Sequence, residues 1–114
     1  DLIGVNAYQF DRDTYIKDLN NALTIMAQVS KTHQKAMAVT ETGYETIPDS
    51  VWWTQTLIPV IEKYPISYVL VWRNAREREN HYYAPYPGHS SAADFVKFYN
   101  DPRTLFAGDM KTNK

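Results

Sequence analysis

The chain has 114 residues, the length of one small domain, and its formal net charge is −1. This charge gives no electrostatic reason to expect a nucleic-acid partner, and no run approaches the ~20 apolar residues of a membrane-spanning helix. The absence of cysteine excludes disulfide bridges and thiolate metal sites. Nine tyrosines and three tryptophans exceed the needs of a small core, so some aromatic rings should line a surface or groove.

The first part of the chain predicts a strand, a helix and a second strand. Residues 2–6 form a short apolar segment, and Asp13 is a suitable N-cap for the helix that follows. Apolar side chains recur along this helix at intervals of three and four, at Tyr15, Ile16, Leu19, Ala22, Leu23, Met26 and Val29. Residues 36–40 are apolar again and form the second predicted strand.

The second predicted strand runs directly into Glu41, and Gly43 follows two positions later. An apolar run that ends in a carboxylate and a glycine turn is typical of a buried strand presenting one side chain at its carboxyl end. Ligands bind at that end in α/β proteins. Gly43 would supply the backbone angles of the turn. From these residues alone, Glu41 is equally consistent with a solvated loop residue.

The middle of the chain predicts a helix, a strand and a long loop. The helix begins at the Pro48-Asp49-Ser50 segment and continues to Tyr64, and Pro59 should kink or divide it because proline lacks the amide donor. Residues 67–72 are dense in β-branched and aromatic side chains, which favours a strand. Residues 73–90 form a polar and aromatic loop.

The last part of the chain predicts two helices and a polar tail. Ser91 and Asp94 have the spacing of a capping box at the start of the first helix. Asp101 and Pro102 pair a cap with a first-turn proline, which predicts a short final helix. Residues 108–114 are polar and are expected to fray.

The predicted order of elements indicates part of a barrel. Strands that alternate with helices imply a parallel sheet, and the absence of polar alternation predicts that both sheet faces are covered. Tyr8, Glu41 and Trp72 lie at or just past the strand ends, 33 and 31 positions apart. A (β/α)₈ (TIM) barrel allots about 31 residues to each strand-helix unit. The predicted fold class is therefore α/β, a TIM barrel of which this chain supplies about three units.

Strand alternation predicts that three side chains converge. Residues two apart share a face, so Glu41 is expected to share one with Val39 and Met37. If these faces point into a barrel, Tyr8, Glu41 and Trp72 meet at its carboxyl mouth. A carboxylate that attacks or supports an oxocarbenium-like centre, a phenol that orients it and an indole that stacks on a sugar ring would suit a glycosidase.

The same segments resemble glycoside hydrolase family 26. The matching segments are Asp1-Leu2-Ile3-Gly4-Val5-Asn6-Ala7-Tyr8, Thr40-Glu41-Thr42-Gly43, Tyr68-Val69-Leu70-Val71-Trp72-Arg73-Asn74-Ala75, His81-Tyr82-Tyr83-Ala84-Pro85 and Asp94-Phe95-Val96-Lys97-Phe98-Tyr99. They resemble the last three strands, the closing loop and the last helix of that family, in the right order. The resemblance implies strands six to eight of the barrel, in an enzyme that is usually a retaining endo-β-1,4-mannanase.

The resemblance also implies roles for individual residues. Glu41 would be the catalytic nucleophile on strand seven, and Tyr8, after strand six, would hydrogen-bond it. Trp72, ending strand eight, would be the aromatic platform for the reacting sugar. Arg73 would contact the next sugar on the non-reducing side.

Two further loop residues are predicted to bind substrate. Asn74 belongs to the matching strand-eight segment, directly after Arg73, and His81 lies in the loop that follows. His81 is placed to hydrogen-bond sugar hydroxyls, although a plain loop histidine fits its position equally well.

The general acid/base of the family, a glutamate after strand four, has no counterpart in this sequence. Glu45, Glu77 and Glu79 are the available carboxylates, and each is better explained as a solvated loop charge. Residues 1–114 are therefore predicted to be the carboxyl-terminal portion of one catalytic domain. Three strands cannot close a barrel, so the amino-terminal remainder of the same barrel is an expected partner.

The remaining aromatic and histidine residues favour structural roles. Trp52 and Trp53, at helical spacing with Leu57, are expected in the core. His33 and His89 are expected to be solvated. The sequence contains no His/Asp/Glu cluster with metal-ligand spacing, so neither a metal nor a cofactor is predicted.

The sequence thus favours a retaining endo-β-1,4-mannanase that acts on mannan, glucomannan or galactomannan by double displacement. The alternative is a carbohydrate-binding or interaction module without catalysis of its own. Mannan is a polymer outside cells, so a secreted, periplasmic or cell-surface location is expected from the substrate class alone.

Overall fold

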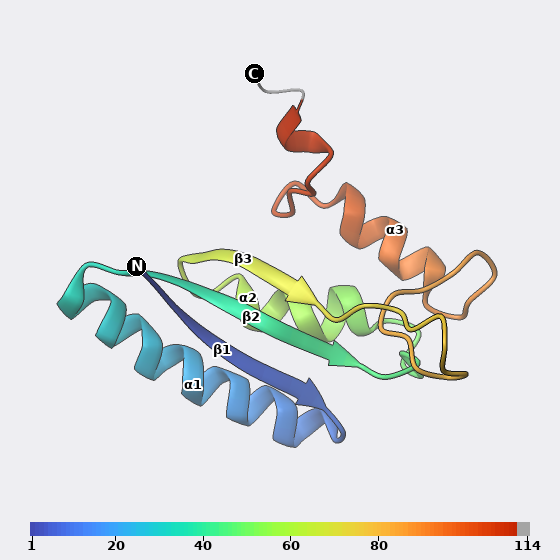
Figure 1. Cartoon of the computed structure of the whole chain (residues 1–114), viewed down its shortest axis with the longest axis horizontal. Coiled ribbons are helices and arrows are strands. Elements are labelled where there is room, and N and C mark those ends of the chain that lie inside the picture. Colours follow the sequence, from blue (N-terminus) through green and yellow to red (C-terminus); the bar gives the residue numbers. More distant parts are fainter. Residues whose placement is uncertain (112–114) are drawn as a thin grey trace.

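Three parallel strands form the sheet of the computed structural model, which describes residues 1–111 (Figure 1). They are β1 (Leu2–Gln9), β2 (Ala36–Tyr44) and β3 (Ile66–Val71), hydrogen-bonded in that order. The three predicted strands and their parallel arrangement are confirmed. β1 and β2 extend farther toward their carboxyl ends than predicted, so Tyr8 and Glu41 lie inside strands, whereas Trp72 lies one residue past β3.

The first helix, α1 (Arg12–His33), follows β1 after the two residues Phe10 and Asp11. Its N-cap is Asp11 and not Asp13, because the extended backbone at Asp11 lets its carboxylate accept from the amide of Thr14 at 2.9 Å. Asp13 lies instead in the first turn. The predicted apolar face is confirmed from Tyr15 to Met26, which are both buried, while Val29 toward the end of the helix is exposed.

The second helical segment is divided as its proline predicts. A π-helical stretch, η1 (Trp53–Leu57), leads into the single turn α2 (Ile58–Ile61), which contains Pro59. Pro59 cannot donate to the carbonyl of Gln55, and the guanidinium of Arg12 donates to that oxygen instead at 3.4 Å. Trp52 and Trp53 are fully buried, which confirms their predicted place in the core.

The third helix, α3 (Ala92–Asn100), lacks the predicted capping box. Asp94 does not reach back to its own helix end, because its buried carboxylate accepts from the amide and hydroxyl of Thr54 at 3.0 and 2.5 Å. Ser91 likewise makes no side-chain cap bond, and its hydroxyl accepts from the indole of Trp53 at 3.3 Å. Both side chains connect α3 to η1, so a tertiary contact replaces the local motif.

The predicted short helix after Asp101 is a turn in the structure. The amide of Thr104 donates to the carbonyl of Asp101 at 3.0 Å, and the Asp101 carboxylate accepts from the amide of Arg103 at 2.8 Å. A 3₁₀ turn, η2 (Asp109–Lys111), follows instead. Residues 112–114 of the predicted polar tail lie outside the described residues.

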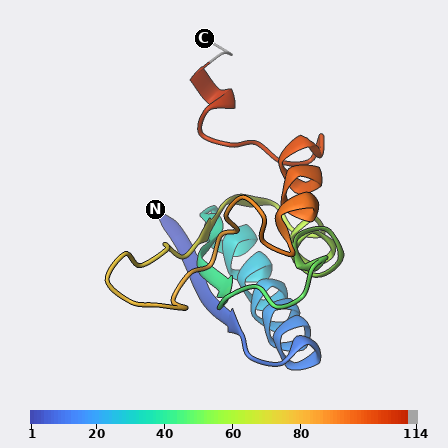
Figure 2. The same ribbon diagram turned by 90° about the vertical axis from the view of Figure 1, so that its right-hand side faces the viewer.

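The helices α1, α2 and α3 lie on one side of the sheet, as Figure 2 shows when the strands are viewed from their carboxyl ends. Apolar residues of the strands, such as Met37 and Val39, pack with α1, η1 and α2 in one buried cluster. On the other face Leu2, Tyr68 and Leu70 are 43%, 45% and 43% exposed. Within the described residues only one face of the sheet is therefore covered, which differs from the expectation that both are.

A β-bulge in β2 sets the direction of Glu41. Val5 pairs with Val39, but the next residue of β1, Asn6, pairs with Glu41, so β2 contains one extra residue at Thr40. The hydroxyl of Thr40 donates to the side-chain oxygen of Asn6 at 2.6 Å on the open face. The predicted sharing of a face by Glu41 and Val39 is wrong, because the extra residue reverses the alternation after Val39.

Candidate active site at the carboxyl end of the sheet

The centre of the candidate site is a hydrogen bond between two neighbouring strands. The phenol of Tyr8 donates to Oε2 of Glu41 at 2.6 Å, and both side chains are half-buried. Tyr8 reaches the open face by ordinary alternation along β1, whereas Glu41 reaches it through the bulge at Thr40. The two residues that the sequence placed together are therefore in direct contact.

The surroundings of Tyr8 keep its phenol in the donor form. Burial and, after it, the hydrogen bond to the Glu41 carboxylate raise the pKa of Tyr8 well above that of an ordinary tyrosine. The proton therefore stays on Tyr8 throughout the neutral and moderately alkaline range. The bond holds Oε2 and leaves Oε1 of Glu41 as the oxygen that can act on another molecule.

Gly43 is required for close approach and not for a turn. Its backbone is not in the left-handed region, and the positive φ angles near this strand end belong to Thr46 and Ile47, at 62° and 41°. A Cβ atom at Gly43 would lie 2.4 Å from Cδ1 of Tyr83, so the ring occupies the space of the missing side chain. The expectation that Gly43 makes the turn is wrong, and the strand continues through it.

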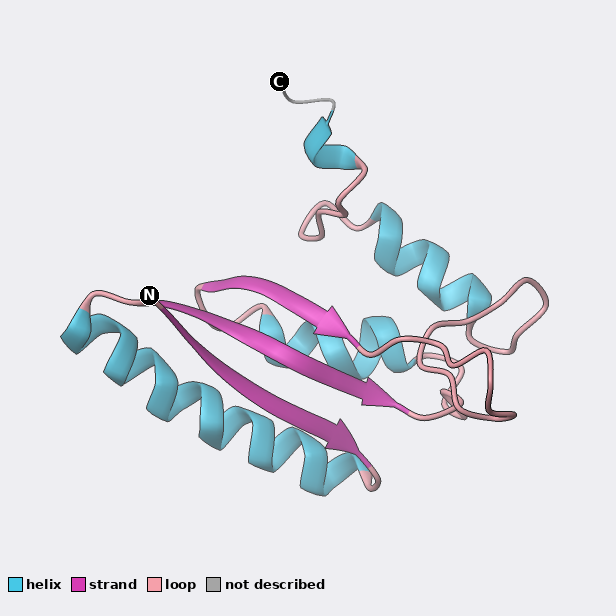
Figure 3. Ribbon diagram, viewed as in Figure 1, coloured by secondary structure: helices cyan, strands magenta, loops and turns pink. Residues whose placement is uncertain are grey.

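The loop of residues 73–90 lies beyond the carboxyl ends of the strands (Figure 3). Trp72 leads into it, half-buried, and its amide donates to the carbonyl of Thr42 at 2.9 Å. Arg73 is exposed, and its guanidinium lies 3.1 Å from the carboxylate of Glu77. These contacts place Trp72 beside β2 at the same sheet end as Glu41, with Arg73 at the solvent side.

Asn74 and His81 are engaged within this loop. Oδ1 of Asn74 accepts from the amides of Tyr83 and Ala84 at 2.9 and 3.0 Å, and its Nδ2 donates to the carbonyl of Ala84 at 3.1 Å. Nδ1 of His81 lies 2.6 Å from Oε1 of Glu45. Both side chains thus shape the loop, and their predicted contacts with substrate stay predictions.

Comparison with solved structures gives strong matches across the whole chain. A GH26 β-mannanase from Bacteroides ovatus is 64% identical, with a TM-score of 0.93, over 96% of this chain and 32% of that one. A modular endo-β-1,4-mannanase from Cellulomonas fimi is 26% identical, with a TM-score of 0.80, over 96% of this chain and 26% of that one. The chain belongs to glycoside hydrolase family 26.

Another family 26 structure, GH26C from Muricauda sp. MAR_2010_75, shares the fold at 24% identity and a TM-score of 0.79. It is matched over 96% of this chain and 31% of its own length. The chain thus spans about a third or less of the solved relatives compared with it. No protein-family model and no curated protein matches the chain.

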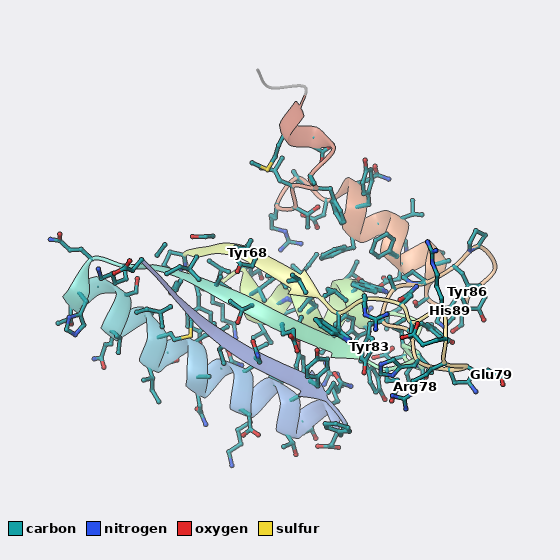
Figure 4. All side chains as sticks on the ribbon, in the orientation of Figure 1. Tyr68, Arg78, Glu79, Tyr83, Tyr86 and His89 are labelled. Atoms are coloured by element: carbon teal, nitrogen blue, oxygen red, sulfur yellow. The ribbon has the colours of Figure 1, made fainter. Side chains whose placement is uncertain are left out.

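Glycoside hydrolysis normally uses two carboxyl groups, and the loop carboxylates of this family 26 chain do not have the setting of a general acid. Glu45 is paired with His81. Hydrogen bonding from its own main chain and then from Arg73 lowers the pKa of Glu77, whereas a general acid needs a raised pKa. Figure 4 places Glu79 at the outer edge of the loop, away from the strands.

His89 and Tyr83 have roles that the sequence did not reveal. His89 was expected to be solvated, but Nδ1 accepts from the amide of Ser91 at 3.0 Å and Nε2 lies 2.9 Å from the carbonyl of Thr46. Tyr83, only 8% exposed, packs between Gly43 and Tyr8. The contact of His89 with Thr46 spans 43 positions, and Tyr83 lies still farther along the chain from Tyr8, so no local pattern signals these contacts.

Metal and membrane features were also sought in residues 1–111. No group of three or more histidine, aspartate or glutamate side chains there could hold a metal ion. In the same residues no helix combines the length and apolar character needed to cross a membrane.

Proposed function

We propose that this chain supplies the nucleophile and part of the substrate cleft of a retaining endo-β-1,4-mannanase. The observation that supports this most directly is the 2.6 Å hydrogen bond from Tyr8 to Glu41 at the carboxyl end of a parallel sheet. The Bacteroides ovatus relative is a β-mannanase and the Cellulomonas fimi relative an endo-β-1,4-mannanase, which supports a β-mannan substrate. Mannan, glucomannan and galactomannan are the substrates that we propose. The relatives named above are described as mannanases or family 26 proteins, so the alternative without catalysis is not favoured.

The proposed reaction is a double displacement. Oε1 of Glu41 attacks the anomeric carbon while an external carboxylic acid protonates the leaving glycosidic oxygen, so the glycosidic bond breaks as a glycosyl–Glu41 ester forms. The same external group, now a carboxylate, then removes a proton from water, which attacks the anomeric carbon and releases Glu41. Tyr8 holds Oε2 through both steps and directs Oε1 toward the sugar.

The neighbouring residues would bind the substrate. Trp72 offers an indole face to the reacting sugar, and Arg73 lies one residue farther out, where it would contact the next sugar on the non-reducing side. Asn74 and His81 would form the wall of the cleft through the loop that they shape. No cofactor is required by this mechanism.

The chain would act as strands six to eight of a closed barrel. β1 and β3 each pair on one side only among the described residues, and the face with Glu41 is open. The amino-terminal remainder of the same barrel would pair with both outer strands, cover that face and bring the acid/base carboxyl. A polymer substrate outside cells would place the enzyme in a secreted, periplasmic or cell-surface location.

The test is Glu41→Ala in the complete barrel, assayed on mannan. Turnover should fall by several orders of magnitude while the protein still folds. Added azide should restore part of the turnover, because the small anion fits the vacated space, and the product should then have inverted anomeric configuration. Glu79→Ala, at the outer edge of the loop, is the matched control and should keep normal turnover.

Two outcomes would contradict the proposed mechanism. If the unmutated enzyme already gives inverted product, Glu41 is not a nucleophile. If the nearest external carboxyl lies about 9 Å from Glu41, and not about 5–5.5 Å, Glu41 acts as a base through water.

A further inference from the structure

We propose that Tyr83 is a positioning residue that holds the phenol of Tyr8 in line with Glu41. This inference rests on the proposed function for its kinetic consequence, but its structural part concerns only the described residues. Tyr83 comes from the loop after β3, and Figure 4 shows it beside the carboxyl ends of the strands. The ring is 8% exposed.

The contact depends on the glycine opposite Tyr8. Tyr8 and Gly43 are partners in the register of β1 and β2. Because Gly43 has no side chain, the Tyr83 ring lies against its Cα, where a Cβ would come within 2.4 Å of Cδ1. The Tyr83 and Tyr8 rings then meet edge to face, with centroids 5.6 Å apart and an interplanar angle of 66°. Tyr83 thus blocks the side of Tyr8 that faces the loop.

Tyr83 is itself held from two directions. Its amide and that of Ala84 both donate to Oδ1 of Asn74, which fixes the backbone at this point of the loop. On the other side, the His81 ring packs edge to face on Tyr83 at 5.4 Å and is tied by Nδ1 to Glu45. The ring therefore has a fixed place, which a support for another side chain requires.

The mechanism by which Tyr83 acts runs through the Tyr8 hydroxyl. The donor must point at Oε2 of Glu41, and a phenol free to rotate about its side-chain torsions would spend part of its time elsewhere. Loss of the Tyr83 ring gives Tyr8 that freedom, and misplacement of about 1 Å can lower turnover by as much as about 100-fold. Substrate binding is mainly the work of other residues, so KM should change little.

The experiment compares Tyr83→Ala, Tyr83→Phe and Gly43→Ala in the complete barrel. Tyr83→Ala should lower kcat about 10- to 100-fold with KM within about threefold, and Gly43→Ala should do the same by displacing the ring. Tyr83→Phe should retain most of the kcat of the unmutated enzyme, because the ring and not the hydroxyl of Tyr83 contacts Tyr8 and Gly43. Tyr86→Ala, from the same loop but 53% exposed and packed on Tyr82 and His89, should match the unmutated enzyme.

A double-mutant cycle separates positioning from general support of the fold. In a Tyr8→Phe background there is no hydroxyl to position, so Tyr83→Ala should add less than about twofold to the loss of kcat. Full additivity of the two losses, or an unchanged kcat in a folded Tyr83→Ala enzyme, overturns the proposal. If Tyr83→Ala does not fold, Tyr83→Leu and Gly43→Ala take its place, and the kcat of each is measured alone and in combination with Tyr8→Phe.

A structural readout keeps this proposal separate from the mannanase assignment. In crystals of the complete barrel, Tyr83→Ala should show the Tyr8 ring displaced or in more than one orientation, with the 2.6 Å contact between its hydroxyl and Oε2 of Glu41 lost or only partly occupied. An unchanged Tyr8 ring and contact in Tyr83→Ala overturns the positioning role, whereas absence of mannan hydrolysis by the unmutated barrel overturns only the proposed function.

Discussion

The phenol of Tyr15 on α1 and the hydroxyl of Thr42 on β2 lie 2.6 Å apart beneath the sheet, and both side chains are buried. Thr42 directly follows Glu41. The bond holds Thr42 toward α1, while Glu41 points to the open face. Burial raises the pKa of Tyr15 to about 12, and the bond to Thr42 acts in the opposite direction. Tyr15 therefore stays protonated at working pH.

The first prediction concerns this buried pair. Tyr15→Phe or Thr42→Val alone should lower the free energy of unfolding by about 1–3 kcal/mol, since each leaves one buried hydroxyl without its partner. The double variant should be less destabilised than the sum of the two, because neither hydroxyl is then left unpaired. Denaturant unfolding of the complete barrel provides the measurement. Additive losses would mean that the two groups do not depend on each other.

Removal of the Tyr8 hydroxyl should affect chemistry more than binding. A hydrogen bond to a charged group is worth about 1.5–3 kcal/mol, so Tyr8→Phe should lower kcat about 10- to 150-fold with little change in KM. The pKa of Tyr8 is raised, so the phenol keeps its proton above the ordinary tyrosine range. The dependence of kcat on pH at alkaline values should therefore be the same in the unmutated enzyme and in Tyr8→Phe. An alkaline fall in kcat that is present in the unmutated enzyme and absent in Tyr8→Phe would contradict this.

Trp72 is predicted to act as a sugar platform. Its indole is half-buried at the end of β3, and Trp72→Ala should remove the stacking area while the main-chain bond to Thr42 survives. The loss of about 1.5–3 kcal/mol for a large buried side chain corresponds to about a 10- to 150-fold lower kcat/KM on mannan oligosaccharides. Trp72→Phe should retain part of the activity. Unchanged kinetics in a folded Trp72→Ala enzyme would return Trp72 to a purely structural role.

The glycine at position 4 should be required by the bulge. A Cβ there would lie 2.3 Å from Cγ2 and 2.7 Å from Oγ1 of Thr40, whose hydroxyl is held by Asn6. Gly4→Ala should therefore cost about 1–3 kcal/mol of unfolding free energy. Gly108→Ala, with no atom within 4 Å, is the control and should change stability by less than about 0.5 kcal/mol. Equal effects of the two changes would show that the bulge tolerates a methyl group.

Arg103 should control the titration of Asp101. Hydrogen bonds from Arg103 lower the pKa of Asp101 to about 2. A carboxyl group whose pKa is depressed on folding adds stability above its ordinary pKa, and this is lost as the pH falls toward 2. Arg103→Gln should return the pKa toward about 3.9, as followed by carboxyl carbon chemical shifts. Lys97→Gln, an exposed change on α3, should leave the Asp101 titration where it was.

The architecture was predictable because it depends on patterns that are local or periodic. The apolar runs identified all three strands, and the spacing of Tyr8, Glu41 and Trp72 indicated parallel units of barrel size. The helical face of α1 was read from intervals of three and four, and Pro59 divided its helix as expected. The strands, the helix face and the proline are local signals, and the spacing of Tyr8, Glu41 and Trp72 repeats at the length of one strand-helix unit, so propensity and periodicity are sufficient for all of them.

Three of the errors have a different cause. Asp94 has the spacing of a cap residue, yet Thr54, forty positions away, binds its carboxylate. His89 was read as solvated, but it joins the turn at Thr46 to the start of α3. Alternation placed Glu41 with Val39, because a one-residue bulge cannot be seen without the partner strand. In each case a contact between distant segments overrode the local pattern.

The bulge at Thr40 means that the direction of the carboxylate depends on how β2 pairs, and not only on its residues. If Thr40 paired in ordinary register, alternation from Val39 would turn Glu41 toward α1, the side that Thr42 now faces. A homologue with the same side chains but without the bulge would therefore present no carboxylate at the open face. Loss of Thr40 itself is different, because Glu41 would then directly follow Val39 and would keep its present direction. In tracing activity among relatives, the strand pairing at this point carries information that the presence of the glutamate alone does not.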